Sequence, residues 1–157
     1  MTVIEGRPHG ASFRFALVVS KYNQFVTDRL RTAAAAALTS AGVAADHVTV
    51  ILVPGAFEIP LAAQQAAASG RYDAVICLGC IIRGETPHFE FIASAVASGL
   101  TTASVATGVP MTFGVLTTNS VEEALARAGE GPDNKGREAA LAALEMASVV
   151  AQLKPKP

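Results

Sequence analysis

Several features are scarce in this chain of 157 residues, and each shortage excludes a class of protein. Two cysteines are too few for the disulfide framework of a small secreted domain, so a reduced, cytoplasmic setting is expected. Basic residues number 12 against 13 acidic ones. The chain therefore lacks the excess positive charge with which nucleic-acid-binding proteins release phosphate counterions, and we expect no nucleic-acid partner.

Long apolar runs are also missing from the sequence. The longest mostly apolar stretch, Ala74–Ile82, is far shorter than the roughly 20 residues of a membrane-spanning helix. The N-terminus (MTVIEGR) has no basic stretch followed by an apolar one, as a signal peptide would. We therefore expect neither a membrane span nor a signal peptide.

Charged residues make up only 16% of the chain, whereas soluble domains average about 25%. Hydrophobic residues make up 51%, and the mean hydropathy is +0.40. This apolar excess indicates large subunit interfaces, because a soluble monomer seldom exposes large apolar patches. A core rich in alanine is the alternative, and the alanine runs at 33–37 and 66–68 support it.

Apolar runs alternate with helix-forming segments along the chain. Strands are predicted at Phe13–Val19, Val48–Val53, Ala74–Leu78 and Met111–Leu116. Helices are predicted at Thr27–Ser40, Ile59–Ser69, Pro87–Leu100, Ser120–Ala128 and Asn134–Leu153. Apolar strands that alternate with helices are typical of a parallel sheet covered on both faces. We therefore expect an α/β fold, a three-layer α/β/α sandwich around a four-stranded parallel sheet of the flavodoxin-like type.

One domain is expected to span residues 1–157, because domains usually have about 100–200 residues. Residues 1–12 and 154–157 are expected to be flexible, as chain ends often are. The N-terminal segment could instead join the sheet of a neighbouring subunit.

The residues that follow the predicted strands indicate a pocket. Ligands of open parallel sheets bind beyond the carboxyl ends of the strands. Two aromatic rings, a carboxylate and an imidazole are expected at that edge, from Tyr22, Phe57, Glu58 and His88. Such a combination favours a flat, polar ligand.

Segment 83–88 (RGETPH) has the features of an anion site. Thr86 is predicted to cap the third helix, with Pro87 at its first position. The free N–H groups of the helix start, beside Gly84, would suit a phosphate. The alternative is an ordinary capped helix with His88 on the surface.

Two basic residues further along the chain could either bind the ligand or be ordinary solvated side chains. Arg127 would strengthen the phosphate interpretation if its side chain reached the same place, although a lone helix arginine is more often solvated. Lys135, after the loop that begins at Gly129, could contact a ligand or be an ordinary solvated lysine.

Cys77 and Cys80 form a C-x-x-C motif, so a thiol redox site is another possibility. Reactive pairs usually lie at a helix N-terminus, whereas Cys77 lies inside an apolar strand, so buried and inert thiols are favoured. The three histidines are scattered and no second cysteine pair is present, so no metal site is predicted. Glycine-rich nucleotide-binding motifs and the nucleophile elbow G-x-S-x-G are missing as well.

Five segments, taken together, resemble the lumazine synthases of riboflavin biosynthesis. They are Val53–Pro60 (VPGAFEIP), Leu78–His88 (LGCIIRGETPH), Phe113–Thr118 (FGVLTT), Arg127–Gly129 (RAG) and Asn134–Gly136 (NKG). Their order and spacing match the family's from about Phe13 to Met146. The resemblance implies an enzyme that joins 5-amino-6-(D-ribitylamino)uracil to 3,4-dihydroxy-2-butanone 4-phosphate. The products are 6,7-dimethyl-8-ribityllumazine, phosphate and water, and the family needs no metal or organic cofactor.

The resemblance also implies roles for individual residues. His88 is the expected proton shuttle, since an imidazole titrates near neutral pH and suits imine formation and ring closure. The pyrimidine substrate is expected to contact Tyr22, Ala56, Phe57, Glu58, Cys80, Ile81, Ile82 and Phe113. The butanone phosphate is expected to contact Glu85, Thr86, Arg127 and Lys135. In the family, Phe113 and Arg127 come from the adjacent subunit.

Three positions depart from the family pattern. Tyr22 stands where phenylalanine or tryptophan is more common, and its hydroxyl needs a partner. Cys80 is tolerable because main-chain atoms do the binding there. Glu85 places a carboxylate beside the expected phosphate, which is unfavourable unless the side chain turns to solvent.

The resemblance implies a homo-oligomer. The family forms pentamers, and many members assemble twelve of them into an icosahedral shell. The loop from Gly129 to Asn134 is short, as in shell-forming members, so we expect the 60-mer. Riboflavin synthase is a candidate partner.

Two alternatives to an enzyme stay open. One is a binding module for lumazine or a flavin, and the other is a shell with a structural or cargo-holding role.

Overall fold

Apolar runs rich in valine and isoleucine form a four-stranded sheet. In the computed structural model, which describes residues 1–156, the strands are β1 (Phe15–Ser20), β2 (Val48–Val53), β3 (Ala74–Ile82) and β4 (Met111–Thr118). All paired strands are parallel, and their order is β2-β1-β3-β4. The predicted four-stranded parallel sheet is confirmed.

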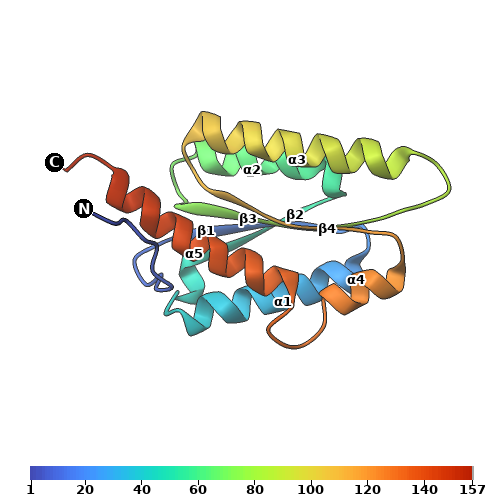
Figure 1. Ribbon diagram of the computed structural model, residues 1–157, viewed down its shortest axis with the longest axis horizontal. Helices are drawn as coiled ribbons and strands as arrows, with labels where there is room; N and C mark the ends of the chain where they lie inside the picture. Colours follow the sequence, from blue (N-terminus) through green and yellow to red (C-terminus); the bar gives the residue numbers. More distant parts are fainter. Residues whose placement is uncertain (157) are drawn as a thin grey trace.

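Helices cover both faces of this sheet. They are α1 (Gln24–Ser40), α2 (Ile59–Ala68), α3 (His88–Thr107), α4 (Val121–Arg127) and α5 (Lys135–Leu153), with short 3₁₀ turns at Ala45–His47 and Ala56–Glu58. Figure 1 shows α2 and α3 on one face and α1, α4 and α5 on the other. The predicted three-layer sandwich is therefore confirmed.

The alternation of side chains along each strand divides the core into two clusters. On β1, Phe15, Leu17 and Val19 pack with α1 and α5, whereas Ala16 and Val18 pack with α2 and α3. All six residues of β1 are buried, because the strand is central and both faces are covered. That double burial explains why the strand is apolar throughout instead of alternating.

β3 extends beyond its predicted end at Leu78 as far as Ile82. Gly79, which follows the predicted strand, lies within β3. A Cβ atom at this position would lie 3.0 Å from Ile59 Cδ1 and 3.2 Å from Ser20 Oγ. The glycine therefore allows close packing and does not break the strand.

α3 is also longer than predicted and continues past Leu100 to Thr107. Gly99 lies inside it, where a Cβ would lie 2.9 Å from Pro60 of α2, so this glycine lets the two helices approach each other. The helix ends at Gly108, which has a φ of 70° in the left-handed conformation. That geometry is common after a helix C-terminus.

Within residues 1–156, α3 is the one helix long and apolar enough to cross a membrane, judged by length and composition, with a mean hydropathy of 1.3. The expectation that no stretch reached this length was therefore wrong. A single helix of this kind is weak evidence for a membrane span, and α3 lies beside α2 over one face of the sheet (Figure 1). Its exposed side chains include Phe91 and Val105. Part of the apolar excess in the composition thus lies on the surface of α3.

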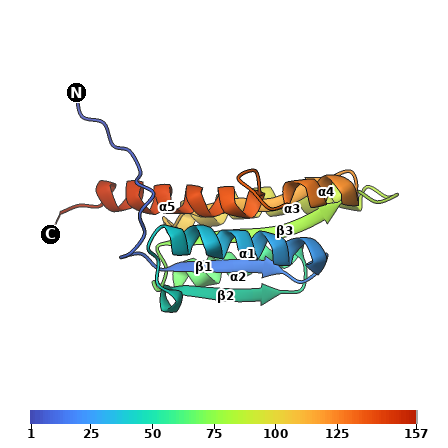
Figure 2. The ribbon, with the colours of Figure 1, turned by 90° about the horizontal axis from the view of Figure 1, so that it is seen from below.

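The N-terminal segment runs to β1 without a helix or strand. Figure 2 shows it crossing α5, where the Glu5 carbonyl accepts a hydrogen bond from Gln152 Nε2 at 2.8 Å. The flexibility of the two ends and a role in a neighbour's sheet stay predictions. Pro157, the last residue of the predicted flexible tail, lies outside the described residues.

Candidate active site

The topology of the sheet marks one place on its carboxyl edge. From β1 the chain passes through α1 to β2 on one side, whereas β3 and β4 extend the sheet on the other side. Ligands of such sheets bind between the two strands where the order reverses. Here these strands are β1 and β3, and the loop after β3 projects from the edge, at the right of Figure 2.

A cavity of about 870 Å³ lies at this place. Its walls come from the loops after β1 and β2, the end of β3 and the first turns of α3. Most of the predicted site residues line it, namely Tyr22, Ala56, Phe57, Glu58, Cys80, Ile81, Ile82, Thr86 and His88. The structure thus brings residues from three separate loops into one cavity.

Exposed aromatic rings form part of the cavity wall. Tyr22 is 73% exposed and Phe57 is 63% exposed. Glu58, which follows Phe57 in the 3₁₀ turn after β2, adds an exposed carboxylate. Two ring faces and one acceptor on short loops over a rigid sheet suit a flat ligand that carries hydroxyl groups.

The start of α3 differs from the prediction by one residue. The Pro87 carbonyl accepts hydrogen bonds from the N–H groups of Glu90, at 3.1 Å, and Phe91, at 3.4 Å, so Pro87 is the N-cap residue. Thr86 makes no capping hydrogen bond, and its assignment as the cap was wrong. Helical hydrogen bonding begins one residue later than predicted, and a proline can occupy the cap because it has no N–H group to satisfy.

His88 is the first residue of α3, and its exposed side chain lines the cavity. Gly84 and Thr86 line the cavity too, whereas Glu85 is exposed and lies outside the lining. The first N–H groups of a helix have no partner within it. This corner therefore combines main-chain donors with an imidazole, and the neighbouring carboxylate is not part of the wall.

Phe113, Arg127 and Lys135 lie apart from this cavity. They line a separate, smaller cavity of about 180 Å³ beside β4, which is an edge strand of the sheet. Phe113 is 49% exposed there. Within one chain, the structure does not bring these three residues together with His88.

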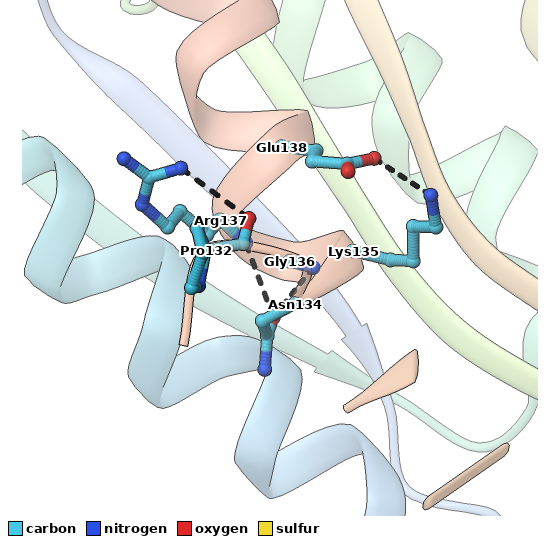
Figure 3. A network of polar contacts seen from close by, with 6 residues as sticks. All are labelled: Pro132, Asn134, Lys135, Gly136, Arg137 and Glu138. Atoms are coloured by element: carbon cyan, nitrogen blue, oxygen red, sulfur yellow. Dashed lines mark hydrogen bonds and ion pairs between the residues drawn. The ribbon is translucent and has the colours of Figure 1, made fainter. Parts of the chain in front are cut away.

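Lys135, in this second cavity, already has an anionic neighbour. Its Nζ lies 2.9 Å from Glu138 Oε2, one helical turn along α5, and both side chains are about half exposed (Figure 3). An exposed pair of this kind is weak. The ammonium group therefore remains available to a stronger anion.

Asn134 holds the loop that joins α4 to α5. Its Oδ1 accepts hydrogen bonds from the N–H groups of Gly136, at 2.8 Å, and Arg137, at 3.2 Å (Figure 3). Its Nδ2 donates to the Gly129 carbonyl at 3.0 Å. This buried asparagine thus fixes the end of α4, which carries Arg127, relative to the start of α5.

Residues 12–151 match the family model of 6,7-dimethyl-8-ribityllumazine synthase. The match covers most of the chain and includes both cavities. The chain belongs to the 6,7-dimethyl-8-ribityllumazine synthase family. Members of this family are transferase enzymes of riboflavin biosynthesis. The resemblance seen in the sequence and the prediction of an enzyme are confirmed.

Asn23 also lines the first cavity, although the sequence had predicted no role for it. Its φ of 60° and ψ of 44° are left-handed, and its Nδ2 donates to the Cys80 carbonyl at 2.9 Å. The adjacent Tyr22 N–H donates to the Pro54 carbonyl at 3.0 Å. An asparagine before a helix was the available signal, because asparagine tolerates left-handed geometry better than most residues.

The two cysteines lie on opposite faces of the sheet. Cys77 belongs to the core cluster beneath α2 and α3, and Cys80 belongs to the cluster beneath α1 and α5. Burial raises the pKa of the Cys77 thiol to about 12 and that of the Cys80 thiol to about 11. Two sulfurs on opposite faces of a strand cannot form a disulfide without backbone movement. The structure therefore contradicts the thiol redox interpretation.

No three His, Cys, Asp or Glu side chains of the described chain, residues 1–156, gather as a candidate metal site.

Proposed function

We propose that this chain catalyses the condensation of 5-amino-6-(D-ribitylamino)uracil with 3,4-dihydroxy-2-butanone 4-phosphate. The observation that carries the proposal is the cavity at the carboxyl edge, where Tyr22, Phe57, Glu58 and His88 converge in a chain of the lumazine synthase family. The products are 6,7-dimethyl-8-ribityllumazine, phosphate and water.

The aromatic side of the cavity binds the pyrimidine substrate. Its ring stacks on Tyr22 and Phe57, whose faces are exposed. Glu58 accepts hydrogen bonds from the ribityl hydroxyls. Main-chain groups of Ala56 and of residues 80–82 hold the edge of the uracil, so the thiol of Cys80 takes no part. With the ring, the ribityl chain and the uracil edge held in this way, the 5-amino group of the substrate is free to react.

The start of α3 binds the phosphate substrate. Main-chain donors at Glu85 and Thr86 hold the phosphate, which the helix N-terminus also favours. The Glu85 side chain stays in solvent, as its exposure supports.

His88 moves the protons of the reaction. The substrate amine attacks the ketone carbon, and loss of water from the adduct gives an imine. Loss of the proton on the hydroxyl-bearing carbon next to the imine then expels phosphate as an anion and leaves an enol. Proton transfer to the terminal carbon converts this enol into a new carbonyl group with a methyl group beside it. The ribityl-bearing nitrogen adds to that carbonyl, and loss of a second water closes the ring. Each step needs a proton given or taken at oxygen, nitrogen or carbon. A positioned general acid–base group contributes about 10²–10⁴-fold to such a rate, and holding the two substrates together supplies much of the rest.

Phe113, Arg127 and Lys135 complete the site of an adjacent chain. Within one chain they lie in the second cavity, beside the edge strand β4. The apolar surface of α3, with Phe91 72% and Val105 81% exposed, supports burial between subunits. We propose a pentamer, assembled into an icosahedral 60-mer because the loop from Gly129 to Asn134 is short, in the cytoplasm and with riboflavin synthase as a candidate partner.

The test is to mix the purified protein with both substrates and follow lumazine absorbance and fluorescence. The uncatalysed condensation is run alongside, because it proceeds slowly without protein. We expect steady, protein-dependent product formation. A folded, oligomeric sample that gave no acceleration would contradict the proposal and favour a binding module. Light scattering and negative-stain images that showed only pentamers or decamers would contradict the 60-mer.

A further inference from the structure

Resting on the proposed function, we propose that Arg83 is a positioning residue. It holds the first turn of α3 against the turn between β4 and α4, and so keeps His88 and the loop 84–87 in place.

Arg83 contacts both segments at the same time. Its Nε donates to Asn119 Oδ1 at 2.9 Å, just after β4. Its Nη1 lies 3.1 Å from Glu90 Oε1, in the first turn of α3. The guanidinium also lies over the ring of Phe89, with 4.6 Å between Cζ and the ring centroid. One planar group thus joins the turn after β4 to the first turn of α3, where His88 and Phe89 line the cavity.

The backbone of Arg83 adds a fixed starting point to these contacts. Its N–H donates to the Thr118 carbonyl at 2.8 Å, which continues the pairing of β3 with β4 by one residue. Arg83 is therefore anchored in the sheet at its main chain. Its side chain contacts Phe89 and Glu90, which follow the loop 84–87 in the first turn of α3.

His88 needs such support because its own side chain is not held. In the part of the chain that the structure describes, no hydrogen bond to its imidazole is present, and the loop 84–87 before it is exposed. The position of the imidazole is therefore set by the backbone of the first turn of α3. Phe89 and Glu90, the next two residues of that turn, are those that Arg83 contacts.

The contacts of Arg83 continue to the helix that carries Arg127. Asn119 donates its N–H to Glu123 Oε2 at 2.9 Å. The Glu123 carbonyl in turn accepts a hydrogen bond from Arg127 Nη1 at 3.1 Å. A continuous set of polar contacts thus connects the start of α3 with the end of α4.

These contacts add little to the stability of the fold. A kinetic effect of removing them would therefore reflect the position of α3 and not a loss of stability. The side chain of Arg83 is 46% exposed and that of Glu90 is 63% exposed, and exposed ion pairs contribute little. A lysine cannot replace this arginine, because an ammonium group lacks the planar fork that reaches two acceptors and stacks on a ring. The geometry therefore points to a guanidinium-specific role.

The test compares Arg83→Met and Arg83→Lys with the wild-type oligomer. We expect Arg83→Met to lower kcat by about tenfold or more, since a misplacement of about 1 Å can reduce a rate about 100-fold. The KM for the butanone phosphate and the inhibition constant of inorganic phosphate should rise. The KM for the pyrimidine should stay within about twofold, because Tyr22 and Phe57 lie on other loops. Arg83→Lys should recover only part of the loss.

Arg71→Met is the matched control. Arg71 is exposed and also lies over an aromatic ring, that of Tyr72 at 5.4 Å, but it precedes β3 at the opposite edge of the sheet. We expect its kinetic constants to match the wild type. Asn119→Ala should act in the same direction as Arg83→Met. The double variant should be no worse than Arg83→Met alone, because both substitutions remove the same contact between Arg83 and Asn119.

Amide hydrogen exchange of residues 84–90 provides a readout that does not depend on turnover. We expect faster exchange there in Arg83→Met and not in Arg71→Met, with equal melting temperatures. Unchanged exchange, or equal increases of KM for both substrates, would overturn the inference. If the wild type makes no lumazine, the proposed function fails. The positioning role is then still tested by the amide exchange of residues 84–90 in Arg83→Met compared with the wild type.

Discussion

The side chain of Asn23 donates a hydrogen bond to the main-chain carbonyl of Cys80, with Nδ2 and O 2.9 Å apart. This bond joins the loop after β1 to the end of β3, the two strands between which the sheet order reverses. Asn23 also adopts a left-handed φ of 60°. One side chain therefore keeps two walls of the cavity at a fixed separation, on a backbone geometry that few residues tolerate.

Two substitutions of Asn23 should separate these contributions. Asn23→Gly loses only the hydrogen bond and should cost about 1 kcal/mol of unfolding free energy. Asn23→Ala also replaces asparagine, which tolerates the left-handed conformation, by a residue that tolerates it less well than glycine does, which should add about 1 kcal/mol. Urea denaturation of both variants measures the difference. Equal losses would show that the backbone conformation contributes nothing.

His88→Ala should lower kcat by about 10²–10⁴-fold, the usual contribution of a positioned acid–base group. Pyrimidine binding, followed by fluorescence titration, should change little because the stacking surfaces lie on other loops. His9→Ala is the control, since His9 lies exposed in the N-terminal segment, and it should behave as the wild type. Unchanged turnover in His88→Ala would exclude the proton-shuttle role.

Arg127→Ala should mainly raise the KM for the butanone phosphate. If Arg127 and His88 of different chains share a site, unfolding and refolding a mixture of Arg127→Ala and His88→Ala chains should restore part of the activity. Some mixed interfaces would then hold both intact residues. Each variant refolded alone is the control. A mixture no more active than its components would show that the two residues do not meet between chains, and equal loss of affinity for both substrates would indicate a collapsed interface.

The buried thiols predict a pH dependence of stability. Burial raises the pKa of Cys77 to about 12, above its ordinary value of 9.0. Below pH 9 the thiol is protonated in both states, and its contribution to stability is complete. Between about pH 9 and 12 the Cys77 thiol ionises only in the unfolded chain. This group should therefore lower the free energy of unfolding by about 1.4 kcal/mol for each pH unit.

Urea unfolding at several pH values, compared with Cys77→Ala, measures that slope. The variant should lose stability less steeply with rising pH, whatever its stability at pH 8. Ellman's reagent at pH 8 should label neither thiol of the native protein and both after unfolding. Rapid labelling of the native chain would contradict the burial of both cysteines.

Gly136→Ala should destabilise the fold by about 1–3 kcal/mol, the usual effect of overpacking. A Cβ there would collide with the Leu30 carbonyl, where α5 crosses α1. Gly84→Ala is the matched control, because no atom lies within 4 Å of the Cβ it would add. Thermal unfolding should distinguish the two variants, and equal midpoints would show that α1 and α5 can move apart without loss.

The strand and helix pattern could be predicted because burial on both faces leaves a strong apolar signal, as in β1. The ends of β3 and α3 could not. The predicted strand stops just before Gly79 and the predicted helix stops one residue after Gly99, whereas each glycine lies within its element and allows a close approach of another element. Whether a glycine ends an element or allows close packing depends on tertiary neighbours, which local patterns do not contain.

The same reasoning applies to the site. Tyr22, Phe57 and His88 could be predicted because parallel strands place the loops at their carboxyl ends on one edge. Asn23 and Arg83 depend on partners 57 and 36 residues away, Cys80 and Asn119, so no local motif reveals them. The separation of Arg127 from His88 within one chain was expected only from the family resemblance.

The two cavities of the chain have a geometric consequence for assembly. In the proposed assembly, each chain offers one incomplete pocket and, beside β4, the side chains that complete another. Contacts of this head-to-tail kind either continue as an open row or close into a ring. In an open row, the first chain and the last each leave one half unused. A closed ring has as many complete pockets as chains, so ring closure gives the largest number of complete active sites per chain.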